Sequence, residues 1–265
     1  MRHRLPFLLA LSLTLLTATF LVVPALMSML AGVTRVYARG VSSGLTTEWI
    51  IEVWRLYSDT IWRSILIALL TLLVTLLIGV PTAYSFVVYP SRFTRILDEI
   101  MTLPLAVPGL AVALAMLQLY GGFMEFRRSS MFIVAGHVVF TLPFMVRAVA
   151  ATLSAVDIRT LEEGAGSLGA RPLRRFIDIV VPAAMPGILA GALMVVTLSI
   201  GEFNLTWMLH TPLTKTLPVG LADSYASMRL EIASAYTLVF FIMIMPLLIA
   251  MQIAARANAG KEATP

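Results

Sequence analysis

The chain alternates long apolar runs with short polar segments. Six runs carry no charged residue: residues 5–34, 64–91, 100–124, 129–146, 179–201 and 232–255. A helix needs roughly 20 apolar residues to cross a bilayer core of about 30 Å. The pattern therefore predicts an all-α integral membrane protein with six transmembrane helices. The fourth run is short, and we expect its helix to continue past Arg147, whose long side chain can reach the interface.

Composition agrees with this fold class and excludes several functions. The 265 residues are 59% hydrophobic and 12% charged, whereas a soluble domain is about 25% charged. We expect the net charge of +5 to anchor helix ends at the membrane, not to bind nucleic acid. The chain has no cysteine, no phosphate-binding loop, and no metal-ligand spacing among its three histidines. We therefore expect a non-enzymatic chain with no catalytic residue, metal or cofactor.

The loop charges give a weak orientation. With the N-terminus inside, eleven of the 19 lysines and arginines lie in the cytoplasm and eight lie outside. This bias favours cytoplasmic termini. The first run follows Arg2 and Arg4 but is longer than the apolar core of a signal peptide, so we interpret it as a retained anchor helix.

The most informative polar segment lies between the fourth and fifth runs, at residues 157–186. Its pattern predicts two short helices that meet at a bend. Asp157 caps the first helix, Gly169 ends it, and Pro172 opens the second. Leu161, Ala165 and Leu168 recur at helical spacing and form a narrow apolar stripe on the first helix. Periodicity leaves two interpretations open: helices lying on lipid headgroups, or a grip for a soluble partner.

The spacing within this segment resembles a known motif. Glu163-Gly164-Ala165 is followed after three residues by Gly169, and after nine more by Ile179-x-Val181-Pro182. This resembles the EAA loop of binding-protein-dependent ABC importer permeases, which reads E-A-A-x-x-x-G, nine residues, I-x-L-P. Glycine replaces the first alanine and valine the leucine, so small and apolar character is kept. The outer loop after the fifth run also has the Thr-Leu-Pro sequence of permeases for 2-aminoethylphosphonate and spermidine/putrescine.

The resemblance implies a type I importer permease with MetI-like architecture in a bacterial inner membrane. Residues 1–63 would form the first helix and a periplasmic segment, residues 64–255 the five-helix core, and residues 256–265 a cytoplasmic tail. Residues 157–186 would form the coupling loop. The implied partners are a cytoplasmic ABC ATPase dimer, a second permease subunit (identical or paralogous), a periplasmic substrate-binding protein and the lipid bilayer. The implied ATPase-coupling residues are Glu163, Gly164, Ala165, Gly169, Ile179 and Pro182.

Two polar residues near the outer end of the fifth run are candidates for the substrate pathway: Glu202 and Asn204. A carboxylate at the centre of a membrane helix costs roughly 2.5–3.5 kcal/mol, so a deep one faces a cavity or partner. Glu202 either lines the pathway, where it would attract a cationic or amino-bearing solute, or lies near the interface, where it costs little.

The favoured substrates are 2-aminoethylphosphonate and polyamine, with ferric iron, thiamine, sulfate and molybdate behind them. The alternative function is an ion-coupled secondary transporter in which Glu202 carries the proton or sodium. The motif at residues 163–182 argues against this alternative, because a secondary carrier needs no ATPase dock.

Overall fold

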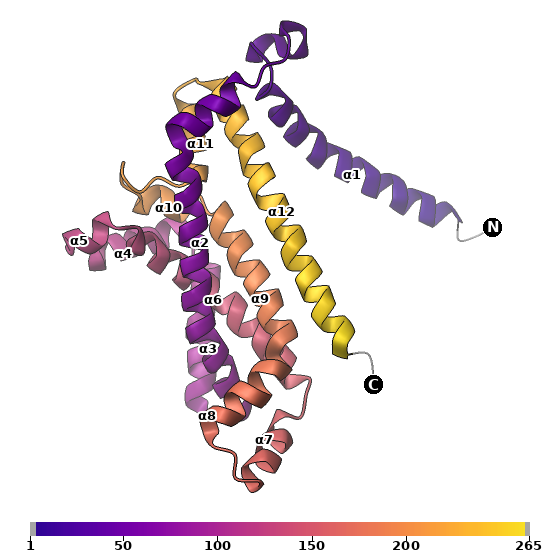
Figure 1. Cartoon of the computed structure of the whole chain (residues 1–265), viewed down its shortest axis with the longest axis vertical. Coiled ribbons are helices and arrows are strands. Elements are labelled where there is room, and N and C mark those ends of the chain that lie inside the picture. Colours follow the sequence, from indigo (N-terminus) through magenta and orange to yellow (C-terminus); the bar gives the residue numbers. More distant parts are fainter. Residues whose placement is uncertain (1–3, 263–265) are drawn as a thin grey trace. The chain divides into compact units, whose positions relative to one another are not determined.

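Every regular element in residues 4–262, the part that this computed structural model describes, is a helix (Figure 1). Five segments are long and apolar enough to cross a membrane. They contain α1 (Arg4–Ala31), α2 (Glu48–Val88), α6 (Ser130–Ser154), α9 (Val181–Gly201) and α12 (Leu230–Glu262). The prediction that the fourth span passes Arg147 is confirmed, since α6 ends at Ser154. Helix α2 begins at Glu48, well before the predicted start at residue 64, so it includes the polar residues that precede the apolar run.

The third predicted span is not one straight helix. It is divided into α3 (Arg92–Ala106) and α4 (Gly109–Tyr120), which are bent by 110° at the break. Val107 has extended backbone angles, as expected for a residue that precedes proline, here Pro108. Helix α3 also begins before the apolar run, at a capping box formed by Ser91 and Thr94. A sixth span exists only if this bent pair is counted as one crossing.

The chain divides into two compact units. The first consists of Met1–Ser58 and Gly220–Met243, and the second of Asp59–Val219 and Ile244–Pro265. The first unit thus includes α1, the 3-10 helix η1 (Tyr37–Ser43), the starts of α2 and α12, and most of α11 (Leu217–Ala226).

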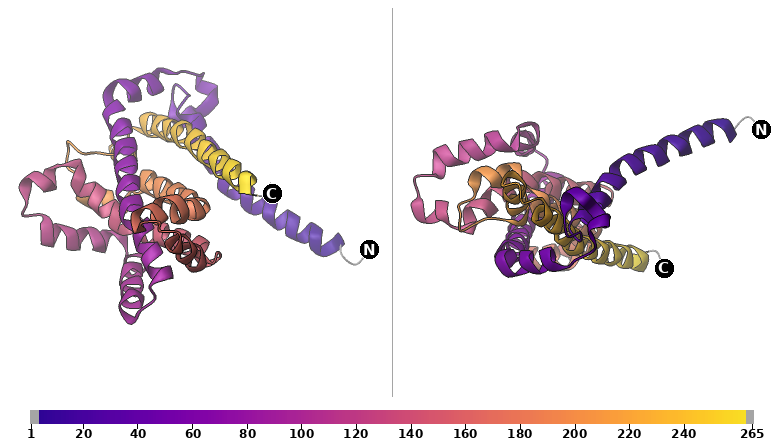
Figure 2. Two further views of the ribbon diagram at one scale, coloured as in Figure 1. Left: turned by 60° about the horizontal axis from the view of Figure 1, so that its bottom comes forward. Right: turned by 90° about the horizontal axis from the view of Figure 1, so that it is seen from above.

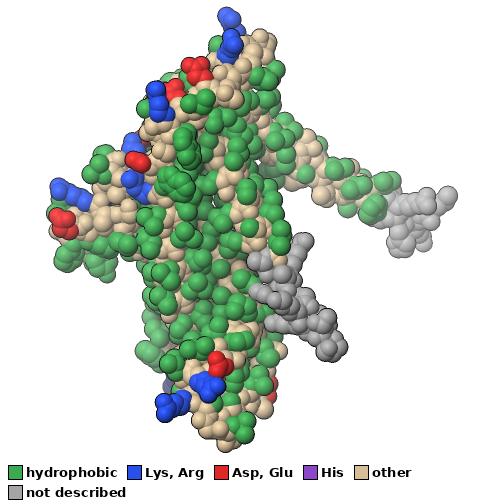
Figure 3. All heavy atoms as spheres, in the orientation of Figure 1, with side chains coloured by type: hydrophobic (Ala, Val, Ile, Leu, Met, Phe, Trp, Pro, Cys, Tyr) green, Lys and Arg blue, Asp and Glu red, His purple; other side chains and the backbone are tan. Residues whose placement is uncertain are grey.

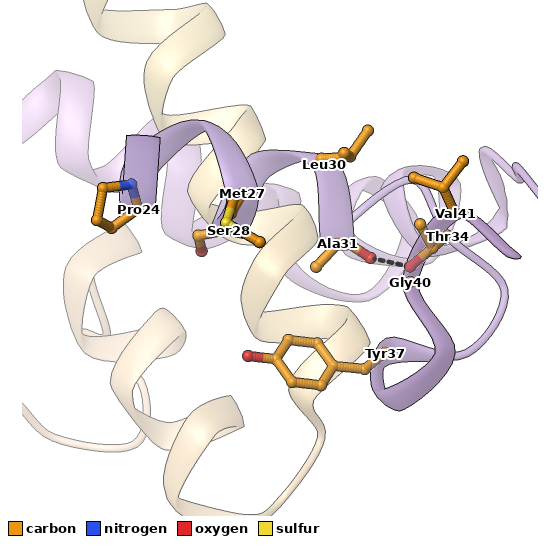
Figure 4. A pocket seen from close by; sticks show the side chains of 9 residues that line it. All are labelled: Pro24, Met27, Ser28, Leu30, Ala31, Thr34, Tyr37, Gly40 and Val41. Carbon is orange, nitrogen blue, oxygen red and sulfur yellow. Dashed lines mark hydrogen bonds between the residues drawn. The ribbon is translucent and has the colours of Figure 1, made fainter. Parts of the chain in front are cut away.

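In the first unit, the end of α1 lies close to α12. A Cβ on Gly32 would lie 2.6 Å from the backbone at Ser234 and Ala235, so only glycine fits there without a shift. The end of α1 and η1 line an open, mainly apolar pocket of about 530 Å³, whose residues include Pro24, Met27 and Tyr37 (Figure 4). The most apolar stretch of α1 has no buried residue, which is the surface expected of a helix that faces lipid or a partner.

The second unit is built around the packing of α6 on α9, which Figures 1 and 2 show side by side. Glycines on α9 allow this approach. A Cβ on Gly187 would lie 2.5 Å from the carbonyl oxygen of Ala148, and one on Gly191 would lie 2.7 Å from Sδ of Met145. Small residues at helix contacts are a common solution in membranes, because close packing replaces the hydrophobic drive that lipid removes.

This contact predicts the effect of one added methyl group. Gly187→Ala is expected to destabilise the folded chain by about 1–3 kcal/mol, because the new methyl group meets backbone atoms that cannot move aside. Thermal unfolding in detergent, followed by size-exclusion chromatography, would show a lower Tm. Gly201→Ala is the matched control on the same helix, since a Cβ there meets nothing within 4 Å. Equal Tm values for the two variants would contradict the proposed close contact.

Candidate functional site

The loop between α6 and α9 folds as the sequence predicts. It comprises α7 (Ile158–Ser167), α8 (Pro172–Arg175) and a π-helical turn, η2 (Phe176–Val180), that runs into α9. The carboxylate of Asp157 accepts hydrogen bonds from the hydroxyl of Thr160 at 2.7 Å and from its backbone N–H at 3.4 Å. These bonds stabilise the charged form and hold the pKa of Asp157 below its usual value. Gly169 ends the helix at φ +84°, and Pro172 lies in the first turn of α8.

One face of α7 points into the protein. Ile158 is 2% exposed and packs into the core formed by α2, α6 and α9. Glu162, one turn later, is 6% exposed, and both of its carboxylate oxygens accept from the hydroxyl of Tyr84 on α2, at 2.9 and 2.8 Å. Its backbone carbonyl accepts from Nη1 of Arg175 at 3.3 Å. The buried carboxylate therefore has a donor, which a buried charge requires.

Other side chains of the loop point away from the protein. Leu161 of α7 is 48% exposed, Leu168 at its C-cap is 90% exposed, and Leu173 of α8 is 70% exposed. Of the apolar stripe predicted on the first helix, Leu161 and Leu168 therefore lie on the surface, whereas Ala165 is half-buried. Figure 3 shows basic and acidic side chains at the bottom of the molecule, where α7 and α8 lie in Figure 1, below a broad hydrophobic face.

Some residues of the sequence motif are exposed and others are partly buried. Glu163 and Gly164 are on the exposed face, and a Cβ on Gly164 would meet nothing within 4 Å. Gly169 is exposed at the bend, and Ala165 is half-buried. Ile179 packs against the core in η2, whereas Pro182 is exposed in the first turn of α9. The motif thus combines a surface portion with the residues that fix it to the next span.

The two candidate pathway residues lie at the other end of α9. Glu202 follows the helix and is half-buried, and its Oε1 accepts from the backbone N–H of Leu205 at 2.8 Å. That bond satisfies a donor in the first turn of α10 (Asn204–Leu209). A Cβ on Gly109, at the start of α4, would lie 3.6 Å from the same oxygen. Asn204 is exposed. The carboxylate of Glu202 therefore has a local structural partner.

The structure also contains a buried polar cluster that was not predicted: His137, Ser199 and Thr206, the last two of which flank Glu202 in the sequence. His137 on α6 is 1% exposed. Its Nδ1 lies 2.8 Å from the hydroxyl oxygen of Ser199 on α9, and its Nε2 lies 2.7 Å from that of Thr206 on α10. The imidazole thus joins three helices where α9 ends and α10 begins. The partners lie 62 and 69 residues away in the chain, so no local pattern indicates them.

Within residues 4–262, the structure brings together no group of three or more histidine, aspartate or glutamate side chains that could hold a metal ion. The candidate site is thus a surface loop that the bond between Glu162 and Tyr84 attaches to α2.

Comparison with solved structures agrees with this fold. A bacterial ABC transporter that imports the acidic polysaccharide alginate has a chain that superposes with a TM-score of 0.72 at 15% identity, covering 97% of this chain and 96% of that one. The inward-facing MetNI methionine ABC transporter gives a TM-score of 0.63 at 16% identity, covering 79% and 97%.

Sequence comparison adds closer relatives. The molybdenum transport system permease protein of Escherichia coli is 31% identical over 180 residues, covering 61% of this chain and 78% of that protein. A probable molybdenum ABC transporter permease of Haloferax volcanii is 32% identical over 185 residues, covering 67% and 68%. A putative 2-aminoethylphosphonate transport system permease of Salmonella typhimurium is 28% identical over 164 residues, covering 62% of each chain.

A family model matches residues 75–259, which contain the loop, the Tyr84 that contacts it and the candidate pathway residues. Its description is a binding-protein-dependent transport system inner membrane component. The chain belongs to this family, and its fold is that of a type I ABC importer permease.

Proposed function

We propose that this chain forms half of the translocation pathway of an ATP-driven importer and that residues 157–186 seat it on a cytoplasmic ATPase. The exposed face of α7 carries this proposal. Leu161 and Leu168 are presented to water beside Glu163, at a loop whose spacing resembles the EAA motif. Apolar side chains grouped at a polar end of a membrane protein are typical of a docking surface.

The charge of the same loop supports a cytoplasmic position. Arg159, Arg171, Arg174 and Arg175 lie within or beside α7 and α8, and short loops rich in arginine favour the cytoplasmic side. With this loop inside, both termini are cytoplasmic and residues 35–47 face the periplasm. We retain the division into residues 1–63, a core at residues 64–255 and a tail at residues 256–265.

The remaining partners follow from the half-pathway that one chain provides. The importer requires a second permease subunit, identical or paralogous, two ATPase subunits and a periplasmic binding protein. ATP hydrolysis belongs to the ATPase subunits, because this sequence has no phosphate-binding loop. An ion-coupled carrier is the weaker alternative. It has no use for an ATPase dock, and the carboxylate of Glu202, which would carry its ion, is already bonded to the backbone of Leu205.

For the substrate, we favour a small oxyanion, either 2-aminoethylphosphonate or molybdate, over a polyamine. As a pathway residue, Glu202 would attract a cationic or amino-bearing solute, but the hydrogen bond from Leu205 gives its carboxylate a structural role. Relatives named for molybdenum and 2-aminoethylphosphonate transport match at 31% and 28% identity, and one named for spermidine/putrescine transport matches at 26%. A thermal-shift screen of the binding protein against these three solutes tests the choice.

Gly164→Leu tests the ATPase dock. Because a Cβ at this position meets nothing within 4 Å, the permease should fold normally, while the larger side chain blocks the close approach of a partner. We expect the co-expressed ATPase to be lost from the purified complex and the Tm of the permease to be unchanged. Gly122→Leu is the control, since its Cβ also meets open space but lies outside the loop. Normal ATPase retention by Gly164→Leu would overturn the proposed surface.

Glu202→Gln and Glu202→Ala separate charge from capping. Glutamine keeps an oxygen that can accept from Leu205, so we expect uptake within about twofold of the unmodified chain, whereas alanine should lower stability by about 1 kcal/mol. Uptake of the solute that the binding protein selects, and the Tm in detergent, are the measurements. Strong loss of uptake in Glu202→Gln at unchanged Tm would instead assign the charge to the pathway.

A further inference from the structure

The two neighbouring glutamates of α7 differ in burial. Glu163 is on the exposed face, whereas Glu162 is 6% exposed and points toward the last two turns of α2. There the hydroxyl of Tyr84 donates to both carboxylate oxygens, at 2.9 and 2.8 Å. A hydrogen bond to a charged acceptor is about twice as strong as a neutral one. A single phenol thus provides the side-chain donor for a buried carboxylate.

The same tyrosine also contacts the second half of the loop. Its ring packs edge-on against Phe176 of η2, with centroids 5.4 Å apart and planes at 73°. Phe176 lies in the turn that continues into α9. Tyr84 therefore touches the loop on both sides of the bend at Gly169, through its hydroxyl on one side and its ring on the other.

A second contact joins α7 to the end of α2. Nη2 of Arg159 donates to the carbonyl oxygens of Val88 at 2.8 Å and Val87 at 3.4 Å. Carbonyls in the last turn of a helix lack partners within it, and a cation there also interacts favourably with the helix dipole. Ile158, packed into the core beside them, completes the attachment. Contacts with α2 thus extend over more than one turn of α7.

We propose that Tyr84 is a positioning residue for energy coupling: with Glu162 it fastens α7 to α2, so that the two helices move as one rigid body when the ATPase pulls on the loop. Only the movement of the loop by the ATPase rests on the proposed function; the attachment of α7 to α2 does not. Without this bond, α7 keeps the contacts of its first turn with α2, through Arg159 and Ile158, while its second half leads into the bend at Gly169 with φ +84°. Motion of the dock would then be absorbed at the bend. With the bond, motion reaches α2 directly.

A spin-label pair on the full-length chain tests the attachment without a substrate. The chain has no cysteine, so Leu77→Cys on α2 and Ser167→Cys on α7, both exposed, can be labelled selectively. Double electron–electron resonance in nanodiscs should give one narrow distance distribution. Tyr84→Phe keeps the ring and removes the donor, and we expect the population of detached α7 to rise about tenfold, seen as a broader distribution.

Two further variants make the result specific. Glu162→Gln keeps an acceptor for the tyrosine hydroxyl, so its distribution should stay narrow. Ser85→Ala is the matched control. It also removes a hydroxyl, from the residue next to Tyr84, but that hydroxyl donates to the carbonyl of Pro81 within α2 and not to α7. An unchanged distribution in Tyr84→Phe, or equal broadening in Ser85→Ala, would overturn the attachment.

The coupling step is tested with the same labels in the complex with the co-expressed ATPase. In the unmodified sequence, the distance should be the same with ADP and with ATP plus vanadate, because α7 and α2 move together. In Tyr84→Phe, ATP plus vanadate should shift it. A nucleotide-dependent distance in the unmodified sequence would refute rigid-body movement. If no ATPase binds the unmodified chain, the proposed function fails, while the measurement on the chain alone still decides the attachment.

Discussion

The close packing of α6 against α9 is the contact on which the rest of the second unit depends. Lipid offers no hydrophobic drive for two apolar helices to associate, so van der Waals contacts between closely packed helices must supply the favourable energy. Gly187 and Gly191 permit that approach, since any side chain at either position would meet Ala148 or Met145. Once the two helices are fixed, both ends of the intervening loop are fixed as well. The loop can then present α7 as a stiff, defined surface.

The same helix pair also supports the irregular backbone at its other end. Where α9 gives way to α10, backbone donors lose their helical partners, which is tolerated in a membrane only if other groups satisfy them. The carboxylate of Glu202 accepts from Leu205, and the imidazole of His137 bonds to Ser199 and Thr206 across the break. A buried network whose members are all satisfied makes one arrangement of these three helices more favourable than its alternatives.

Local chemistry was sufficient to predict some of these features from the sequence. The cap at Asp157, the stop at Gly169 and the start at Pro172 were predicted correctly, because each depends on residues within one turn. The break before Pro108 was not predicted in the third apolar run, because a proline does not determine whether the chain continues or turns by 110°. That angle depends on packing by other helices. The pairing of His137 with Ser199 depends on the same long-range packing and has no local signal.

Helical periodicity indicated that α7 has two faces but not which one is buried. An apolar stripe is ordinarily the buried face, yet Leu161 and Leu168 are exposed and Glu162 is inside. The reason is that the end of α2 offers a hydroxyl at this position. An apolar residue at position 162 could fill the same space, but it would allow α7 to slide or rotate on α2. A carboxylate bonded to one phenol is directional, so it fixes the rotation of the helix and thereby which residues face outward. The bond between Glu162 and Tyr84 therefore determines which residues of the loop are exposed.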